Sequence, residues 1–134
     1  MHHYPRQIAC FLCLFATVYF ASNTAFAQED TQCKRLQIPT TVKGFVGGES
    51  HDCYVVHGRK GRVMTVIISW RHKGNTGGFE MRDSPDFVNG SDISFGKTSD
   101  SGRRWTGSIP KTLDYYIFVV AHPDDHYSLK LTEH

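Results

Sequence analysis

The sequence predicts an all-β protein, an antiparallel β-sandwich of seven to eight short strands in a jelly-roll-like arrangement, which follows a cleaved signal peptide. Beyond residue 27, no stretch of helical length repeats apolar residues at positions i, i+3, i+4 and i+7. Short runs that alternate apolar and polar residues are instead separated by clusters of Gly, Asn, Asp and Pro. Strands at this spacing, each with one apolar face, are typical of two sheets packed face to face.

Residues 1–27 contain the three parts of an export signal. Arg6 supplies a positive charge, residues 8–20 are almost wholly apolar, and Ala25-Phe26-Ala27 fits the pattern of a cleavage site. The apolar run is shorter than the roughly 20 residues that cross a bilayer as a helix. We therefore expect cleavage after Ala27, a periplasmic or secreted protein, and no association with the membrane afterwards. An uncleaved membrane anchor is the alternative.

An N-terminal arm, residues 28–41, is expected to precede a single sandwich domain, residues 42–134. Cys10 and Cys13 lie in the signal, so Cys33 and Cys53 remain in the exported chain. Two cysteines in an exported domain favour a disulfide, which would tie the arm to the first clear strand. Closing a loop of this size contributes about 3 kcal/mol in the chain-entropy model. A two-thiol metal or redox site is the alternative.

Four strands are predicted in the first half of the domain, at residues 41–46, 51–57, 62–70 and 79–82. The strand at 62–70 is the longest. Its inner face carries four apolar side chains, Met64, Val66, Ile68 and Trp70. Residues 72–78 hold three glycines and are expected to form a loop.

Four more strands are predicted at residues 92–95, 105–109, 114–121 and 126–132. The strand at 114–121 is apolar on both faces, which indicates a central strand covered on both sides. The pattern is weakest over residues 83–104, where residues 97–104 are expected to form a long polar loop.

The chain has 134 residues with 15 Lys+Arg and 13 Asp+Glu, a formal net charge of +2. This charge is too small, and its cations too scattered, for a nucleic-acid partner. Composition also excludes disorder, collagen-like repeats and coiled coil.

Five segments occur in the order found in a known family of bacterial domains. They are Tyr54-Val55-Val56, residues 60–66, residues 105–110, residues 114–119 and residues 127–131. Together they resemble the pre-peptidase C-terminal (PPC) β-sandwich, and the chain is similar to the periplasmic inhibitors of goose-type lysozyme. The resemblance covers residues 44–131, with a poor fit at 83–103. It implies a sandwich fold and a non-catalytic binding role, with a lysozyme as one possible partner.

The sequence indicates no enzyme and no cofactor. Hydrolase, zinc-protease and phosphate-loop motifs are absent from it. Ser50, His51 and Asp52 are adjacent, but on a strand His51 points away from the other two. His122, Asp124, Asp125 and His126 are candidate metal ligands, which would suit a metal-dependent enzyme. A polar hairpin turn is the favoured interpretation of this segment.

The candidate binding surface lies on two loops, at residues 71–78 and 97–104. Its residues are Arg71, Lys73, Asn75, Arg103, Arg104 and Trp105. If both loops meet at one end of the sandwich, their basic side chains would suit an anionic glycan or an acidic protein. Trp105 is expected in the core, and an exposed platform beside Arg104 is the alternative.

Two functions are weighed on this basis. The first is an exported, non-catalytic binding protein, more narrowly an inhibitor of a cell-wall lytic enzyme. The second is a carbohydrate- or cell-wall-binding module. Because many lysozymes are basic, an inhibitor gains from acidity, and this chain is near neutral overall. Its acidic residues can nevertheless cluster locally.

Overall fold

A computed structural model describes residues 33–134. The expected signal peptide and its cleavage site lie outside these residues. The described chain forms nine strands and contains no helix. No helix within residues 33–134 is therefore long and apolar enough to cross a membrane.

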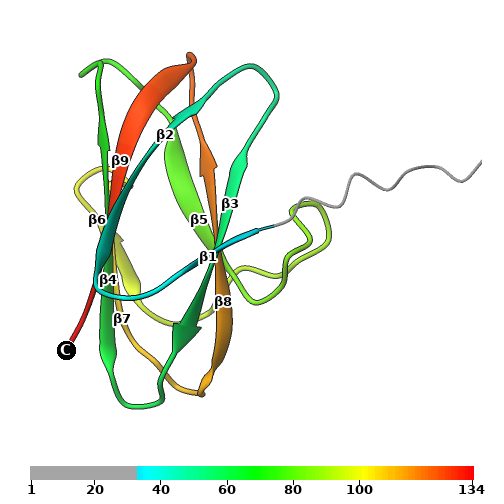
Figure 1. Cartoon of the computed structure of the whole chain (residues 1–134), viewed down its shortest axis with the longest axis vertical. Helices are drawn as coiled ribbons and strands as arrows, with labels where there is room; N and C mark the ends of the chain where they lie inside the picture. The colour runs from blue at the N-terminus through cyan, green and yellow to red at the C-terminus, as the bar shows by residue number, and fades with distance from the viewer. Residues whose placement is uncertain (1–32) are drawn as a thin grey trace, which may run out of the picture.

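Two sheets pack face to face, which confirms the predicted all-β sandwich (Figure 1). The first sheet has the order β1 (Lys34–Leu36), β3 (Asp52–Gly58), β8 (Leu113–Val120) and β5 (Gly78–Arg82). The second has the order β2 (Thr40–Val46), β9 (Asp125–Glu133), β4 (Val63–Trp70), β7 (Arg104–Ser108) and β6 (Lys97–Ser99). β1 pairs with β3 in parallel, and the other pairings are antiparallel.

The structure differs from the prediction in its polar strands. The prediction of a strand at residues 92–95 is wrong. Asp92 makes an isolated bridge to Arg82, and Ile93 and Phe95 pack against the core outside any strand. β6 lies instead at residues 97–99, within the expected loop, and its three residues are exposed. β1 was also missed, since Leu36 is its single buried residue. Edge strands of this kind carry no apolar alternation for a sequence pattern to detect.

The core consists of the inward-facing rows of the long strands. Met64 and Val66 of β4 are fully buried, and they lie beside Leu129 and Leu131 of β9 on the inner face of the same sheet. In β8, Ile117 points into the core while Phe118 is buried on the outer face. β8 pairs with β3 on one side and β5 on the other, which confirms that it is a central strand.

Polar contacts join the sheets at the β2–β3 side. Tyr127 of β9 donates a hydrogen bond to the Asp52 carboxylate at 2.5 Å, and the Tyr54 and Tyr127 hydroxyls lie 2.5 Å apart. Burial raises the pKa of Tyr127, and the hydrogen bonds to Asp52 and Tyr54 raise it further. Gly44 of β2 lies beneath this ring, where a Cβ would come within 2.4 Å of the Tyr127 hydroxyl oxygen.

The disulfide predicted between Cys33 and Cys53 is present and holds the start of β1 against β3. A second tie joins β1 to β8, because Arg35 donates to both carboxylate oxygens of Asp114 at 3.2 and 2.7 Å. Hydrogen bonds from Arg35 and then His57 lower the pKa of Asp114 to about 2. The short strand β1 is thus held by the Cys33–Cys53 disulfide and by the ion pair between Arg35 and Asp114.

Replacing Gly44→Ala is expected to lower the free energy of unfolding by about 1–3 kcal/mol, the usual cost of overpacking. The added methyl group must displace the Tyr127 ring, whose hydroxyl is held by two hydrogen bonds. Chemical denaturation measures the effect. Gly74→Ala is the control, because a Cβ there meets nothing within 4 Å. Equal stabilities for the two variants would contradict this role of Gly44.

Candidate functional site

Three loops meet at one end of the sandwich, after β2, β4 and β8, at the top of Figure 1. Asn75 of the β4–β5 loop donates from its side chain to the Pro123 carbonyl at 2.7 Å. Thr76 donates from its backbone N–H to the His122 carbonyl at 3.0 Å. The turn between β6 and β7 joins this group, because Arg103 donates to the Lys73 carbonyl at 3.3 Å. The two loops selected from the sequence therefore do meet.

Arg71 and Lys73 are exposed in this group, and Arg103 is half-buried beside them. Arg104 belongs to β7 and pairs with Asp100, Nε to Oδ2 at 3.1 Å. We call Arg71, Lys73 and Arg103 the basic end. Two of its cations come from the β4–β5 loop and the third from the β6–β7 turn, so the contact between Arg103 and Lys73 brings three positive charges to this end.

Two of the candidate surface residues are buried instead. Trp105 is 5% exposed and packs in the core, where its ring meets Phe95 at 5.7 Å. Its position in β7 opposite Val66 turns it inward, so it offers no exposed platform beside Arg104. Asn75 is also 5% exposed, and its side-chain oxygen accepts hydrogen bonds from the backbone N–H groups of Gly77 and His122. Asn75 therefore holds the loops together rather than meeting a ligand.

Asp125, the first residue of β9, holds the start of the β4–β5 loop in place. Its buried carboxylate accepts hydrogen bonds from the His72 backbone N–H, the His72 imidazole and the His126 backbone N–H, at 2.9, 2.7 and 2.8 Å. Burial alone would raise the pKa of Asp125, but these hydrogen bonds outweigh it and hold the pKa below its ordinary value. Asp125 thus orders the loop that carries Arg71 and Lys73.

The candidate metal ligands are not brought together. No group of three or more His, Cys, Asp or Glu within residues 33–134 is arranged to hold a metal ion. The Asp125 carboxylate is occupied by His72 and His126. Ser50, His51 and Asp52 also have separate partners. Ser50 bonds the Gly47 carbonyl, His51 stacks on Phe87, and Asp52 accepts from Tyr127.

Phe45 was missed by the sequence reasoning. It is 53% exposed on the outer face of β2, and its ring lies 4.8 Å from that of His126. His126 in turn accepts a hydrogen bond at its carbonyl from the backbone N–H of Arg71. Its exposure could have been predicted from the sequence, because strand alternation places Val42 and Val46 inward and therefore Phe45 outward. The pair Phe45–His126 adds an aromatic contact surface next to the basic end.

The fold places this chain in the class of small β-sandwich domains predicted from its motifs. No protein-family model and no curated protein matches the chain. Among solved structures, PliG of Aeromonas hydrophila, a periplasmic lysozyme inhibitor of g-type lysozyme, matches with a TM-score of 0.59 and 18% identity over 76% of this chain and 97% of that one. The pre-peptidase C-terminal domain of a collagenase from Bacillus anthracis matches with a TM-score of 0.54 and 20% identity, over 75% and 95%.

PliG of Salmonella Typhimurium, also a periplasmic inhibitor of g-type lysozyme, matches with a TM-score of 0.50 and 17% identity, over 75% and 98%. At these identities the likeness establishes the fold, and it confirms the resemblance on which the prediction rested.

Replacing Asp125→Asn is expected to lower the free energy of unfolding by about 1–3 kcal/mol, because the amide leaves at least one buried N–H donor without an acceptor. The amide of His72 should also exchange its hydrogen faster. Asp124→Asn is the control, since this neighbouring carboxylate is exposed and its loss should change stability by less than about 0.5 kcal/mol.

The difference between wild type and Asp125→Asn is expected to shrink in acid. Because the folded pKa of Asp125 lies below its ordinary 3.8, the carboxylate's contribution is complete above that pH and is lost as the pH falls through the lower folded value. Denaturation at pH values on either side of 3.8 measures this. A constant difference down to the acid limit would contradict it.

Proposed function

We propose that this protein is an exported, non-catalytic binding protein that inhibits a cell-wall lytic enzyme of the lysozyme class. The observation that carries the proposal is the structural match to the Aeromonas hydrophila inhibitor, in which 97% of that chain is covered. The match spans a free-standing inhibitor domain from end to end. A domain of this kind acts by presenting a surface, which requires no catalytic group.

The chemistry of the described residues supports a binding role. Ser50, His51 and Asp52 are each directed to other partners, so they form no nucleophile and base pair. The Cys33–Cys53 disulfide is in keeping with an oxidising compartment such as the periplasm. An inhibitor stationed there meets lytic enzymes that arrive from outside the cell.

The basic end favours a second candidate, an anionic glycan of the cell wall as the ligand. Phe45 is exposed beside His126, and the His126 backbone is bonded to Arg71. An aromatic ring next to cations can contact the faces of sugar rings while the cations meet carboxylates.

The inhibitor function predicts saturable loss of lytic activity. The full chain is expressed with its own N-terminal segment, and the exported product is titrated into bacterial cell-wall lysis by goose-, chicken- and invertebrate-type lysozymes. We expect inhibition of one type at near-stoichiometric ratios, because a folded domain offers one interface per enzyme. Undiminished lysis by all three types at a large excess would overturn the proposed function.

The glycan candidate predicts sedimentation with purified peptidoglycan. Phe45→Ser and Lys73→Glu should each reduce the bound fraction severalfold, since one removes the exposed ring and the other reverses a charge. Lys111→Glu is the control, because Lys111 is exposed in the β7–β8 connection, away from the basic end. Equal binding by wild type and all three variants would exclude the basic end as a glycan site.

A further inference from the structure

A groove of about 290 Å³ lies between β5 and β6, the strands that end the two sheet orders. It follows the seam of the sandwich, where inward-facing side chains reach the surface. Its apolar lining comes from β5, the β5–β6 connection and β7, namely Phe79, Met81, Ile93, Phe95 and Trp105. The centroid of the Phe95 ring lies 5.7 Å from that of Trp105 and 5.6 Å from that of Tyr115. The wall of the groove is therefore continuous with the core.

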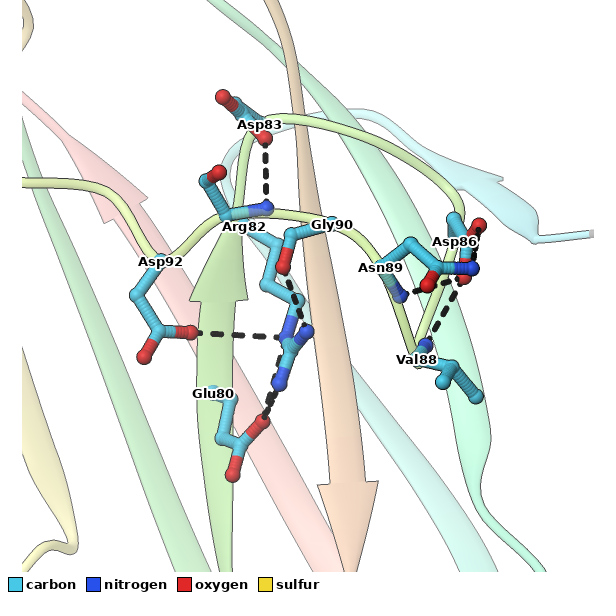
Figure 2. Close-up of polar contacts among 9 residues, drawn as sticks. Glu80, Arg82, Asp83, Asp86, Val88, Asn89, Gly90 and Asp92 are labelled. Atoms are coloured by element: carbon cyan, nitrogen blue, oxygen red, sulfur yellow. Dashed lines mark hydrogen bonds and ion pairs between the residues drawn. The ribbon is translucent and has the colours of Figure 1, made fainter.

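Two carboxylates at the rim share one cation. Figure 2 shows the Arg82 guanidinium between Glu80 and Asp92, at 2.6 Å from the Glu80 carboxylate and 3.5 Å from that of Asp92. The same guanidinium also donates to the Gly90 carbonyl at 2.9 Å. The Arg82 side chain is 14% exposed, whereas that of Asp92 is 76% exposed. At the mouth of the groove, two carboxylates therefore face one guanidinium, and the Asp92 carboxylate is the more exposed of the two.

The adjoining loop adds negative charge in a fixed position (Figure 2). The Asp86 carboxylate accepts hydrogen bonds from the backbone N–H groups of Val88 and Asn89, both at 2.9 Å. The Asn89 hydrogen bonds, with that from Val88, hold the pKa of Asp86 below its ordinary value. Asp83 accepts from the Ser91 backbone N–H at 3.2 Å. Both carboxylates are thus held in fixed orientations by backbone N–H donors.

Residues 80–92 consequently form an acidic edge on a chain whose overall charge is slightly positive. They contain four carboxylates and one Lys or Arg, which is Arg82. Phe87 anchors the loop from beneath, because its ring stacks on His51 at 4.4 Å and packs on Phe118 at 5.2 Å. A loop ordered before binding loses little conformational entropy when a partner docks.

We propose that the groove receives a lysine or arginine side chain from the lytic enzyme, with the alkyl stem against Phe79 and Phe95 and the cationic head at Glu80 and Asp92. This inference rests on the proposed function and names the surface that performs it. Long cationic side chains bury their methylene groups along apolar walls and keep the charge at the rim. The acidic edge would steer a basic enzyme toward this contact.

Three variants test the groove, each measured as the inhibition constant against the lysozyme type that wild type inhibits. Asp92→Lys reverses the exposed rim charge, and Thr98→Arg places a cationic side chain from β6 into the groove itself. Both positions are exposed, so folding should be preserved, and circular dichroism verifies it. Glu49→Gln is the control, because it changes the net charge by as much as Thr98→Arg does but removes an exposed carboxylate from the β2–β3 loop outside the groove.

Asp92→Lys and Thr98→Arg are expected to weaken inhibition about tenfold or more, with Glu49→Gln close to wild type. Inhibition by wild type should also weaken as salt is raised, and less so in Asp92→Asn. Wild-type inhibition that both groove variants retain would overturn the groove and leave the proposed function standing. A wild-type protein that inhibits none of the three lysozyme types would overturn the proposed function, and the groove's assigned occupant with it.

Discussion

The hydroxyl of Tyr127 joins the two sheets by polar contacts at the side where the chain passes from β2 to β3. Its single proton goes to Asp52, and its oxygen lies beside the hydroxyl of Tyr54. The pKa of Tyr127 is raised by burial, so the hydroxyl stays protonated and remains a donor. This arrangement requires a residue without a side chain at Gly44. Cys53, the next residue after Asp52, forms the disulfide that holds β1.

Alternation of apolar residues was enough to predict the strands that build the core. β4, β8 and β9 each bury a row of alternate apolar residues. In β4, for example, this row is visible in the sequence as Met64, Val66 and Ile68. β1 and β6 could not be predicted from apolar alternation. β1 is held by backbone pairing with β3 and by the Cys33–Cys53 disulfide, and β6 is held by backbone pairing with β7. The location of Trp105 could not be read from its residue type, because a tryptophan also suits an exposed binding platform. Its pairing opposite Val66 in the sheet is what makes it a core residue.

The candidate site was partly predictable for a similar reason. Arg71, Lys73 and Arg103 could be recognised as loop cations, but their proximity depends on the Arg103 contact with the Lys73 carbonyl. The role of Asn75 follows from the Pro123 and His122 backbone groups, which are more than 45 residues away along the chain. The groove falls in the segment where the sequence pattern was weakest. Its walls come from three strands and a connection, so no local pattern could have revealed it.

The charge distribution bears on the choice between the two proposed partners. A net charge of +2 suggests no preference, yet the structure separates a basic end from an acidic edge. The acidic edge combines fixed carboxylates with a groove whose rim holds the Glu80 and Asp92 carboxylates around the single guanidinium of Arg82. The cations of the basic end lie next to the aromatic pair Phe45–His126, whose rings are exposed on β2 and β9. Of the two proposed partners we therefore favour a basic protein at the acidic edge, where fixed carboxylates adjoin a groove, over a glycan at the basic end.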